Sequence, residues 1–265
     1  MVLTNMIPKI IHYCWFGRNP LPQLAIKCIE SWKKFLPDYE IKEWNEDNFD
    51  VNIIPYTKEA YEAKKYAFVS DYARFWILYH HGGLYFDTDV EVIRPMNEII
   101  ARGPFMGCER NASDTSIASV APGLGLGVNP GLGLYKDLLE LYASTHFIKG
   151  NGGVYKTIVD YTTEVLVKHG LTNLKGIQQV AGIWIYPKDF FAPKDVDSKE
   201  LLITKNTVSI HHYDASWAEW YDKRAGERGP KLKKVFGDVW GTKINLVIYL
   251  LQKYGVTGCL RKIFS

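Results

Sequence analysis

Three acidic side chains recur at every second position in the segment Leu84-Tyr85-Phe86-Asp87-Thr88-Asp89-Val90-Glu91. On a β-strand, this spacing places Asp87, Asp89 and Glu91 on one face together with Tyr85. Carboxylates so close together repel one another, so a divalent cation or several hydrogen-bond donors must offset their charge. The pattern therefore predicts a metal site. The alternative for a bare Asp-x-Asp is a pair of ordinary turn residues.

A predicted helix precedes this strand and adds further charged groups. From Ala60 to His81, apolar and aromatic residues recur at helical spacing, and Gly82-Gly83 ends the pattern. Asp71 and Arg74 stand at i and i+3 in this helix and so project from one of its faces. We expect the helix and the strand to bring an acid, a base and metal ligands together.

The composition excludes several classes of protein. The 265 residues, of which 47% are hydrophobic and 14% aromatic, suffice for one large domain or two small ones. With 32 basic and 29 acidic residues, the net charge is only +3, which does not favour a nucleic-acid partner. The four cysteines form no CxxC pair, which is typical of reduced thiols in a cytosol.

No segment of the sequence resembles a signal peptide or a membrane span. The longest apolar run, residues 246–251, is far too short to cross a bilayer. These features predict a cytoplasmic protein that is either soluble or peripheral at the inner face of the cytoplasmic membrane.

The N-terminal region predicts a βαβ unit. A strand is expected over residues 7–16, a helix over 23–35 and a second strand over 39–44. Such units build open parallel sheets whose ligands lie at the carboxyl ends of the strands. Trp15 falls at that end of the first strand, where it is either a core residue or a platform on which a nucleobase stacks.

The rest of the chain supplies further elements of an α/β fold. The pattern predicts strands over residues 104–108, 183–186 and 208–212, and helices over 134–144 and 154–168. The glycine-rich segment 122–133 matches no phosphate-binding loop, so we interpret it as a flexible loop beside the site. His211 and His212 are adjacent on a strand and point to opposite faces, so only one of them can approach Asp89.

The C-terminal residues form a basic and apolar tail. Basic residues from Lys223 onward precede an apolar stretch over residues 244–251. A helix of this kind can lie on an anionic membrane surface, and the same pattern also docks ordinary terminal helices onto a domain. The sequence leaves both alternatives open. We predict a catalytic domain over residues 1–222 and a helical extension over residues 223–265.

Four ordered segments carry a resemblance to a known family. Residues 7–17, 67–74, 82–89 and 211–217 resemble glycosyltransferase family 32, whose sugar-binding region contains a DXD motif. The family includes bacterial capsule and cell-surface polysaccharide enzymes and fungal mannosyltransferases, and its core is similar to that of the clostridial glucosylating toxins. The resemblance implies a GT-A fold with a Rossmann-like mixed sheet, a nucleotide-sugar donor, a Mn²⁺ or Mg²⁺ ion and retention of anomeric configuration.

The resemblance also implies roles for individual residues at the donor site. Trp15 would stack on the base, Asp71 and Arg74 would hold the donor sugar and its phosphates, and Tyr85 would line that pocket. Asp87 would contact ribose, sugar or metal. Ser216 and Trp217 would close over the diphosphate. The catalytic set is therefore Asp71, Arg74, Asp87 and Asp89.

The implied metal site has two protein ligands besides Asp87. Asp89 would be the direct ligand, His212 is the expected second ligand, and His211 is held in reserve. Carboxylates select a hard ion, and one imidazole shifts the preference toward Mn²⁺.

These features predict a metal-dependent glycosyltransferase. We expect it to move a hexose or N-acetylhexosamine, carried by UDP, to a lipid-linked oligosaccharide or polysaccharide acceptor in bacterial surface polysaccharide synthesis, such as capsular polysaccharide biosynthesis. One alternative is a toxin-like protein glycosyltransferase. An alternative of another class is a haloacid-dehalogenase-type phosphatase with Asp87 as nucleophile, because a hydrophobic strand ending in Asp-x-Asp also describes that family.

Overall fold

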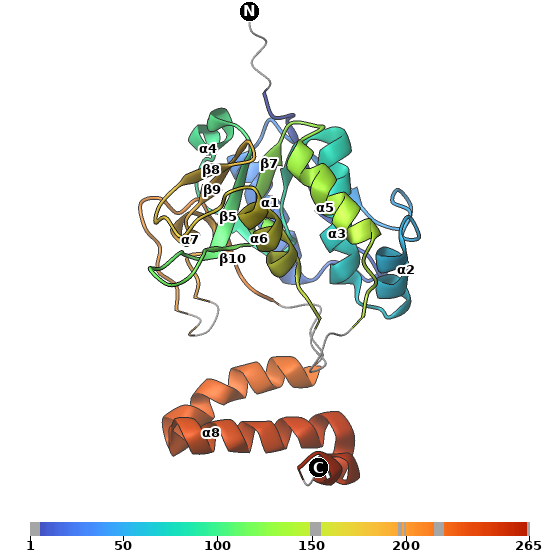
Figure 1. Cartoon of the computed structure of the whole chain (residues 1–265), viewed down its shortest axis with the longest axis vertical. Coiled ribbons are helices and arrows are strands. Elements are labelled where there is room, and N and C mark those ends of the chain that lie inside the picture. The colour runs from blue at the N-terminus through green and yellow to red at the C-terminus, as the bar shows by residue number, and fades with distance from the viewer. Residues whose placement is uncertain (1–5, 149–154, 196–197, 199, 215–219, 264–265) are drawn as a thin grey trace, which may run out of the picture. The chain divides into compact units, whose positions relative to one another are not determined.

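The computed structural model describes residues 6–148, 155–195, 198, 200–214 and 220–263. The chain forms two compact units, Met1–Tyr213 and Asp214–Ser265 (Figure 1). The division between them falls nearer the N-terminus than the boundary predicted after residue 222, and the packing of the tail stays a prediction.

The N-terminal βαβ unit forms as the sequence predicts. β1 (Ile10–Cys14) leads into α1 (Gln23–Phe35), and β2 (Glu40–Trp44) returns parallel to β1. α1 buries Cys28 and Trp32 completely, so its apolar face explains why it covers the sheet.

The central sheet of the first unit is mixed. Its strand order is β2-β1-β3-β7-β5-β9-β8, with β6 paired to β5. β1, β2 and β3 run parallel, while β7 is antiparallel to both β3 and β5. The remaining strands of this sheet are β3 (Gly83–Tyr85), β5 (Phe105–Arg110), β6 (Ser119–Val120), β7 (Leu126–Val128), β8 (Gln178–Val180) and β9 (Ile183–Tyr186). A separate antiparallel pair joins β4 (Val90–Val92) to β10 (Ser209–His211).

Helices cover both faces of the sheet, and a hydrophobic core lies on each side. One core contains residues of α3 (Tyr66–His81), α5 (Gly133–Ala143) and α6 (Ile158–Lys168). The other contains residues of α1, α4 (Asn97–Arg102) and α7 (Lys188–Phe191). The predicted α/β class, with a mixed sheet flanked by helices, is confirmed (Figure 1).

Two predicted elements differ from the structure. The helix expected from residue 60 to 81 is divided into α2 (Pro55–Glu62) and α3. The division falls at Lys64, whose φ of 57° lies in the left-handed region and ends the first helix. The segment 122–133 contains a short 3₁₀ turn, Pro122–Leu124, and the buried strand β7. It lies beside the candidate site as predicted, but the prediction of a flexible loop is wrong because β7 fills a place within the central sheet.

The second unit is built from one helical element. α8 (Trp220–Ile263) departs from helical backbone angles at Gly237 and Gly255. Among the described helices, none is both long enough and apolar enough to span a bilayer.

Candidate active site

The Asp87-Thr88-Asp89 segment lies in a turn. Phe86 N–H still donates to the His12 carbonyl of β1 (3.2 Å), but Asp87 N–H donates to the Gly123 carbonyl instead (3.2 Å). Val90 N–H then closes the turn on the Asp87 carbonyl (3.0 Å). The predicted continuous strand over residues 84–91 is therefore wrong, because the chain leaves the central sheet after β3 and pairs with β10 as β4.

Parallel pairing sets the edge of the sheet at which this turn lies. β1 and β3 are parallel, with Ile11 opposite Leu84 and His12 opposite Tyr85, so their carboxyl ends meet at one edge. Trp15 directly follows β1 at that edge, where it is partly buried and its indole N–H donates to the Asn19 carbonyl (2.6 Å). The structure thus brings Trp15 to the same edge as the DXD turn, and its role as a base platform stays a prediction.

Arg74 forms ion pairs with both Asp71 and Asp87. Its guanidinium, only 4% exposed, lies 3.0 Å from Asp71 Oδ1 and 3.2 Å from Asp87 Oδ1. Arg74 Nη1 also donates to Asp87 Oδ2 (3.3 Å), so the guanidinium contacts both oxygens of that carboxylate. Tyr85 lies under the guanidinium, 4.9 Å from ring centroid to Cζ, and its hydroxyl donates to Asp87 Oδ1 (3.1 Å). Asp87 is therefore held in one orientation.

Asp71 lies deeper than the other acids. Its side chain is buried, and burial raises the pKa of its carboxyl to about 7, with the Asp87 charge adding to the rise and Arg74 opposing it. The predicted i, i+3 relation between Asp71 and Arg74 on one helix produces this buried pair. In the structure Arg74 thus has carboxylate partners, and direct contact of Arg74 with donor phosphates stays a prediction.

Gly123 allows this arrangement to form. A Cβ at this position would overlap Asp87 Oδ2 and would lie 3.2 Å from Arg74 NH1. Because both belong to the partly buried Arg74–Asp87 ion pair, neither can move away without loss of a partner. The glycine-rich segment therefore contributes by letting its backbone approach Asp87.

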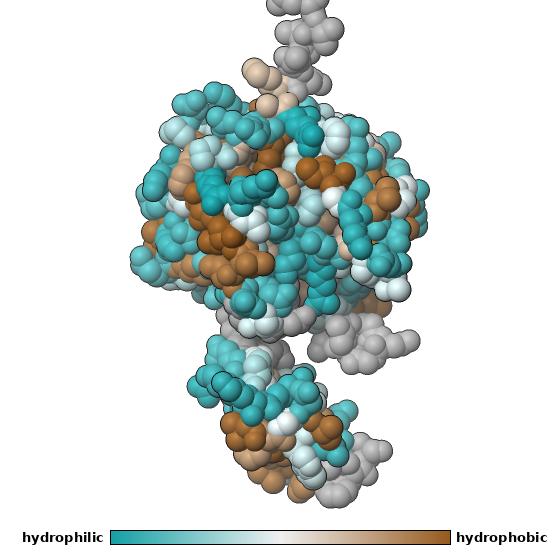
Figure 2. Space-filling view, turned by 90° about the vertical axis from the view of Figure 1, so that its left-hand side faces the viewer, coloured by the Kyte–Doolittle hydropathy of each residue, from teal (hydrophilic) through white to brown (hydrophobic). Residues whose placement is uncertain are grey.

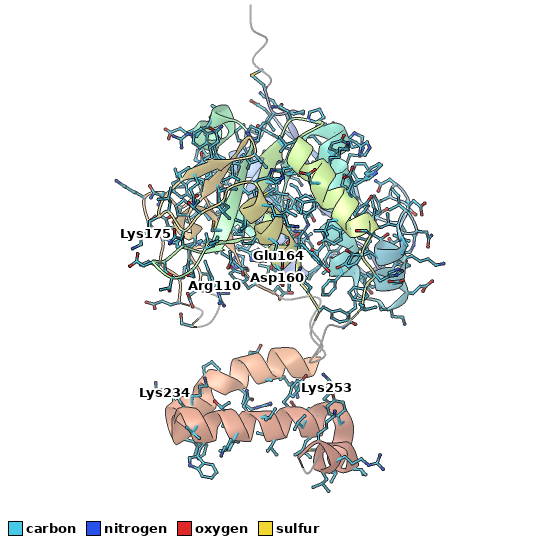
Figure 3. The ribbon with its side chains drawn as sticks, in the orientation of Figure 1. Arg110, Asp160, Glu164, Lys175, Lys234 and Lys253 are labelled. Atoms are coloured by element: carbon cyan, nitrogen blue, oxygen red, sulfur yellow. The ribbon has the colours of Figure 1, made fainter. Side chains whose placement is uncertain are left out.

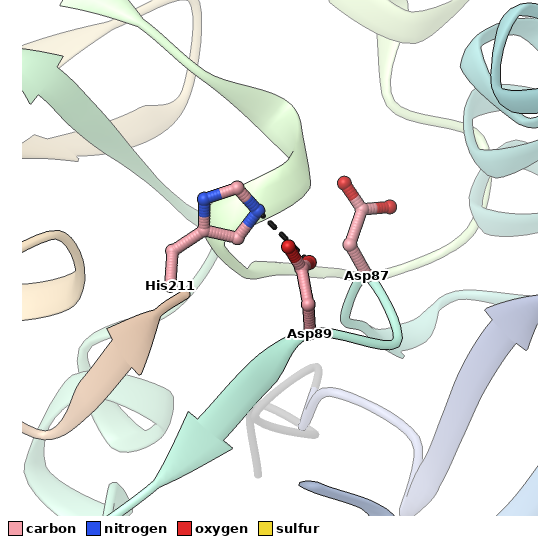
Figure 4. Close-up of side chains that lie close together, drawn as sticks. All are labelled: Asp87, Asp89 and His211. Carbon is pink, nitrogen blue, oxygen red and sulfur yellow. Dashed lines mark ion pairs between the residues drawn. The ribbon is translucent and has the colours of Figure 1, made fainter. Parts of the chain in front are cut away.

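A cluster with the composition of a metal site lies at the end of the turn. Asp87, Asp89 and His211 each offer one ligand atom, and these atoms all lie within 4.8 Å of one another (Figure 4). His211 Nε2 lies 3.0 Å from Asp89 Oδ1. Strand pairing produces this contact, because His211 lies opposite Val90 in the β4–β10 pair. Two carboxylates and one imidazole form a donor set that fits Mn²⁺ and Mg²⁺.

The region that contains Asp71, Arg74 and the two aspartates of the turn is similar to a known protein family. Residues 22–106 match the family described as glycosyltransferase sugar-binding region containing DXD motif. The match includes both DXD aspartates and the Asp71–Arg74 pair, although it ends well before His211. Residues 22–106 are therefore similar to the sugar-binding region of DXD glycosyltransferases.

Curated relatives share this region of the domain. Inositol phosphoceramide mannosyltransferase 3 of Schizosaccharomyces pombe is 32% identical over 98 residues, which cover 36% of this chain and 27% of the relative. An uncharacterized glycosyltransferase of Acanthamoeba polyphaga mimivirus is 34% identical over 106 residues, which cover 38% of this chain and 42% of the relative. The chain thus spans less than half the length of these relatives.

Solved glycosyltransferase structures are similar at a greater distance. PaToxG glycosyltransferase shares 19% identity at a TM-score of 0.46, covering 61% of this chain and 69% of that chain. The galactosyltransferase LgtC shares 13% identity at a TM-score of 0.42, covering 85% of this chain and 95% of that chain.

The structure places the two adjacent histidines differently from the prediction. His212 Nε2 lies 2.8 Å from Glu91 Oε2, and Lys27 Nζ lies 2.8 Å from the same oxygen. The expectation that His212 joins the metal site is corrected, because strand alternation turns its imidazole toward Glu91. His211, held in reserve, is the histidine beside both DXD aspartates. Burial alone would raise the pKa of Glu91, but Lys27 and His212 lower it overall.

Carboxylates give the surroundings of His211 a negative charge that a cation would offset. Burial would lower the pKa of its imidazole, but the Asp89 carboxylate, with smaller contributions from Asp87 and Glu109, raises it overall. Its Nδ1 atom is buried and has no hydrogen-bond partner within the described part of the chain. The Tyr213 ring meets the imidazole edge-on at 4.3 Å between centroids, which fixes the ring plane.

Sequence reasoning did not identify the close approach of Gly123 to Asp87 or the effect of Glu109 on His211. Gly123 was signalled by its glycine-rich segment, whereas nothing in the sequence around Glu109 indicated that it contributes to the field at His211. Ser216 and Trp217, expected to close over the diphosphate, lie outside the residues that the structure describes.

Proposed function

We propose that this protein is a metal-dependent, retaining glycosyltransferase. It would move a hexose or N-acetylhexosamine from a nucleotide-sugar donor, with UDP as the expected nucleotide, to a lipid-linked oligosaccharide or polysaccharide. The observation that carries the proposal is the Asp87, Asp89 and His211 cluster at the carboxyl edge of the sheet, directly after the strand that matches the DXD family.

The residues of the site would divide the work of donor binding. Asp89 and His211, with Asp87, would hold a Mn²⁺ or Mg²⁺ ion, which supplies positive charge against the charge that develops on a leaving nucleoside diphosphate. Arg74 holds Asp87 by both carboxylate oxygens, so Asp87 keeps its orientation when the donor arrives. Tyr85 adds a hydrogen bond to the same carboxylate and so restricts it further.

The names of the relatives support a lipid-borne acceptor. Inositol phosphoceramide mannosyltransferases 1 and 3 of Schizosaccharomyces pombe and the mannosyl phosphorylinositol ceramide synthase of Saccharomyces cerevisiae are named for glycosylated lipids. By analogy, we include GDP-mannose among the donors to be tested. Bacterial surface polysaccharide synthesis at the inner face of the cytoplasmic membrane stays a prediction from the sequence.

A donor panel tests the proposal directly. The purified chain is incubated with UDP-glucose, UDP-galactose, their N-acetyl forms and GDP-mannose, each with Mn²⁺ and with EDTA, while donor hydrolysis and thermal shift are recorded. We expect one donor to stabilise the protein and to be slowly hydrolysed only with metal, and Asp89→Asn to abolish both effects. Exposed Asp38, which pairs with Lys9 far from the cluster, gives the control Asp38→Asn.

The phosphatase alternative predicts a different result. Both oxygens of Asp87 are engaged by Arg74 and one also by Tyr85, which leaves the carboxylate poorly placed as a nucleophile. No response to any donor, together with hydrolysis of a generic phosphate ester that Asp87→Asn removes, would refute the transferase and support the phosphatase.

A further inference from the structure

The tail unit folds back on itself as a helical hairpin. α8 is interrupted at Gly237 and Gly255, where φ is 74° and 67°. Across the first interruption, a Cβ at Gly241 would overlap the backbone of Lys233, so glycine is needed for the two segments to approach this closely. Segments 220–236 and 238–254 therefore run side by side (Figure 3).

Polar side chains join the two segments of the hairpin. Arg228 donates from Nε to Asn245 Oδ1 (2.9 Å) and from NH1 to Gln252 Oε1 (3.3 Å). Asn245 Nδ2 donates in turn to the Ala225 carbonyl (2.9 Å). The contact between the two segments therefore includes a network of polar side chains, while Ile244 and Ile248 of segment 238–254 are partly buried.

Other large apolar side chains of the same segment are exposed. Val247, Leu251 and Tyr254 follow Trp240 at spacings close to whole helical turns, so the four residues share one stripe. We call these four residues the outer stripe, and within the tail unit they are exposed by 65% (Trp240), 40% (Val247), 39% (Leu251) and 44% (Tyr254). Figure 2 shows hydrophobic surface on this unit.

Positive charge surrounds the outer stripe. Residues 224–262 contain nine basic and two acidic side chains, whereas the whole chain has 32 basic and 29 acidic residues. Lys234 and Lys253 lie toward opposite ends of the hairpin (Figure 3), and Lys243 Nζ lies 5.3 Å from the Trp240 ring centroid. Exposed aromatic and aliphatic residues bordered by lysines fit the boundary between acyl chains and anionic headgroups.

We propose that the tail hairpin binds the surface of an anionic lipid bilayer through the outer stripe and the lysines beside it. The inference rests on the proposed function in one respect, because a lipid-linked acceptor would be presented at that same surface. The sequence alone left membrane binding and docking of the tail as equal alternatives. The exposed stripe and the positive charge around it favour the membrane, since the four stripe residues remain exposed after the hairpin has formed.

Flotation of the full chain with lipid vesicles tests this proposal. The vesicles are phosphatidylcholine alone or phosphatidylcholine mixed with phosphatidylglycerol. We expect binding to the mixed vesicles only, and a partition coefficient about tenfold lower in Trp240→Ser, which loses a large apolar side chain from the stripe. Lys234→Gln should lower it about fivefold at low salt. Leu202→Ser is the matched control, because Leu202 is 69% exposed in the first unit.

The possible results separate this proposal from its rivals and from the proposed function. Equal flotation of Trp240→Ser and the control overturns the proposal. A dimer in light scattering that Trp240→Ser converts to a monomer, without vesicle binding by either protein, assigns the stripe to a second copy instead. A lower thermal midpoint in Trp240→Ser without vesicle binding assigns it to the rest of the chain. Metal-dependent donor hydrolysis reports on the proposed function independently of all these results.

Discussion

His12 makes the stability of the first unit depend on pH. Its imidazole is buried in β1, where Nδ1 accepts a hydrogen bond from the Trp44 indole (3.0 Å) and Nε2 lies 3.1 Å from the Gly82 carbonyl. The indole can only donate, so Nδ1 must be the unprotonated nitrogen and Nε2–H must donate to the carbonyl. Protonation of Nδ1 would break the bond to Trp44 and bury a charge.

The size and sign of the effect follow from the pKa of His12. Burial lowers this pKa from 6.5 to about 4, with His81 and Lys42 adding to the fall and the Gly82 carbonyl opposing it. In the unfolded chain His12 therefore becomes protonated below pH 6.5, whereas in the folded chain it stays neutral down to pH about 4. The stabilisation from neutral His12 is complete above that range, and about 3 kcal/mol of it is lost as the pH falls through it.

Urea unfolding of wild type and His12→Gln at pH 7.0 and pH 4.5, followed by tryptophan fluorescence, measures this contribution. Other groups titrate too, and Asp71, whose pKa is raised by burial, acts in the opposite direction. The difference between the two proteins isolates His12. We expect wild type to lose about 2–3 kcal/mol more than His12→Gln between these pH values. An equal loss in both proteins would refute the buried neutral imidazole.

Three further substitutions test the geometry of the site. His211→Ala should weaken Mn²⁺ binding in calorimetry by about tenfold or more, while the matched His212→Ala should leave it unchanged; equal losses would contradict the assignment. Gly123→Ala should lower kcat/KM for donor hydrolysis because its methyl group displaces the Asp87 carboxylate, and wild-type activity would show that the turn adjusts. Arg74→Met should destabilise the fold by about 3–5 kcal/mol in urea unfolding, because it leaves the buried Asp71 and the partly buried Asp87 without their cation; a loss under about 1 kcal/mol would contradict the burial of this ion pair.

The sequence predicted elements whose residues interact locally. The apolar spacing of residues 23–35 predicted α1 with the bounds that the structure shows, and Gly82 ended α3 as expected. Alternation from Leu84 to Glu91 failed, because the period of side chains along a strand does not reveal its hydrogen-bonding partner. β3 pairs with β1 and β7, whereas β4 pairs with β10, and the turn between them carries the aspartates.

Asp87 and Asp89 are neighbours in sequence, yet different parts of the fold position them. Asp87 is fixed by Arg74 and Tyr85, which belong to the preceding helix and strand. The backbone of Asp89 is fixed from β10, because His212 N–H donates to the Asp89 carbonyl (3.0 Å). The side chains of Glu91 and His212, which meet next to this bond, are 121 residues apart in sequence. The contacts of Asp87 with Arg74 and Tyr85 are thus encoded locally and could be predicted from the sequence. The choice between the two histidines depends on the register of a long-range strand pair, which no local pattern specifies.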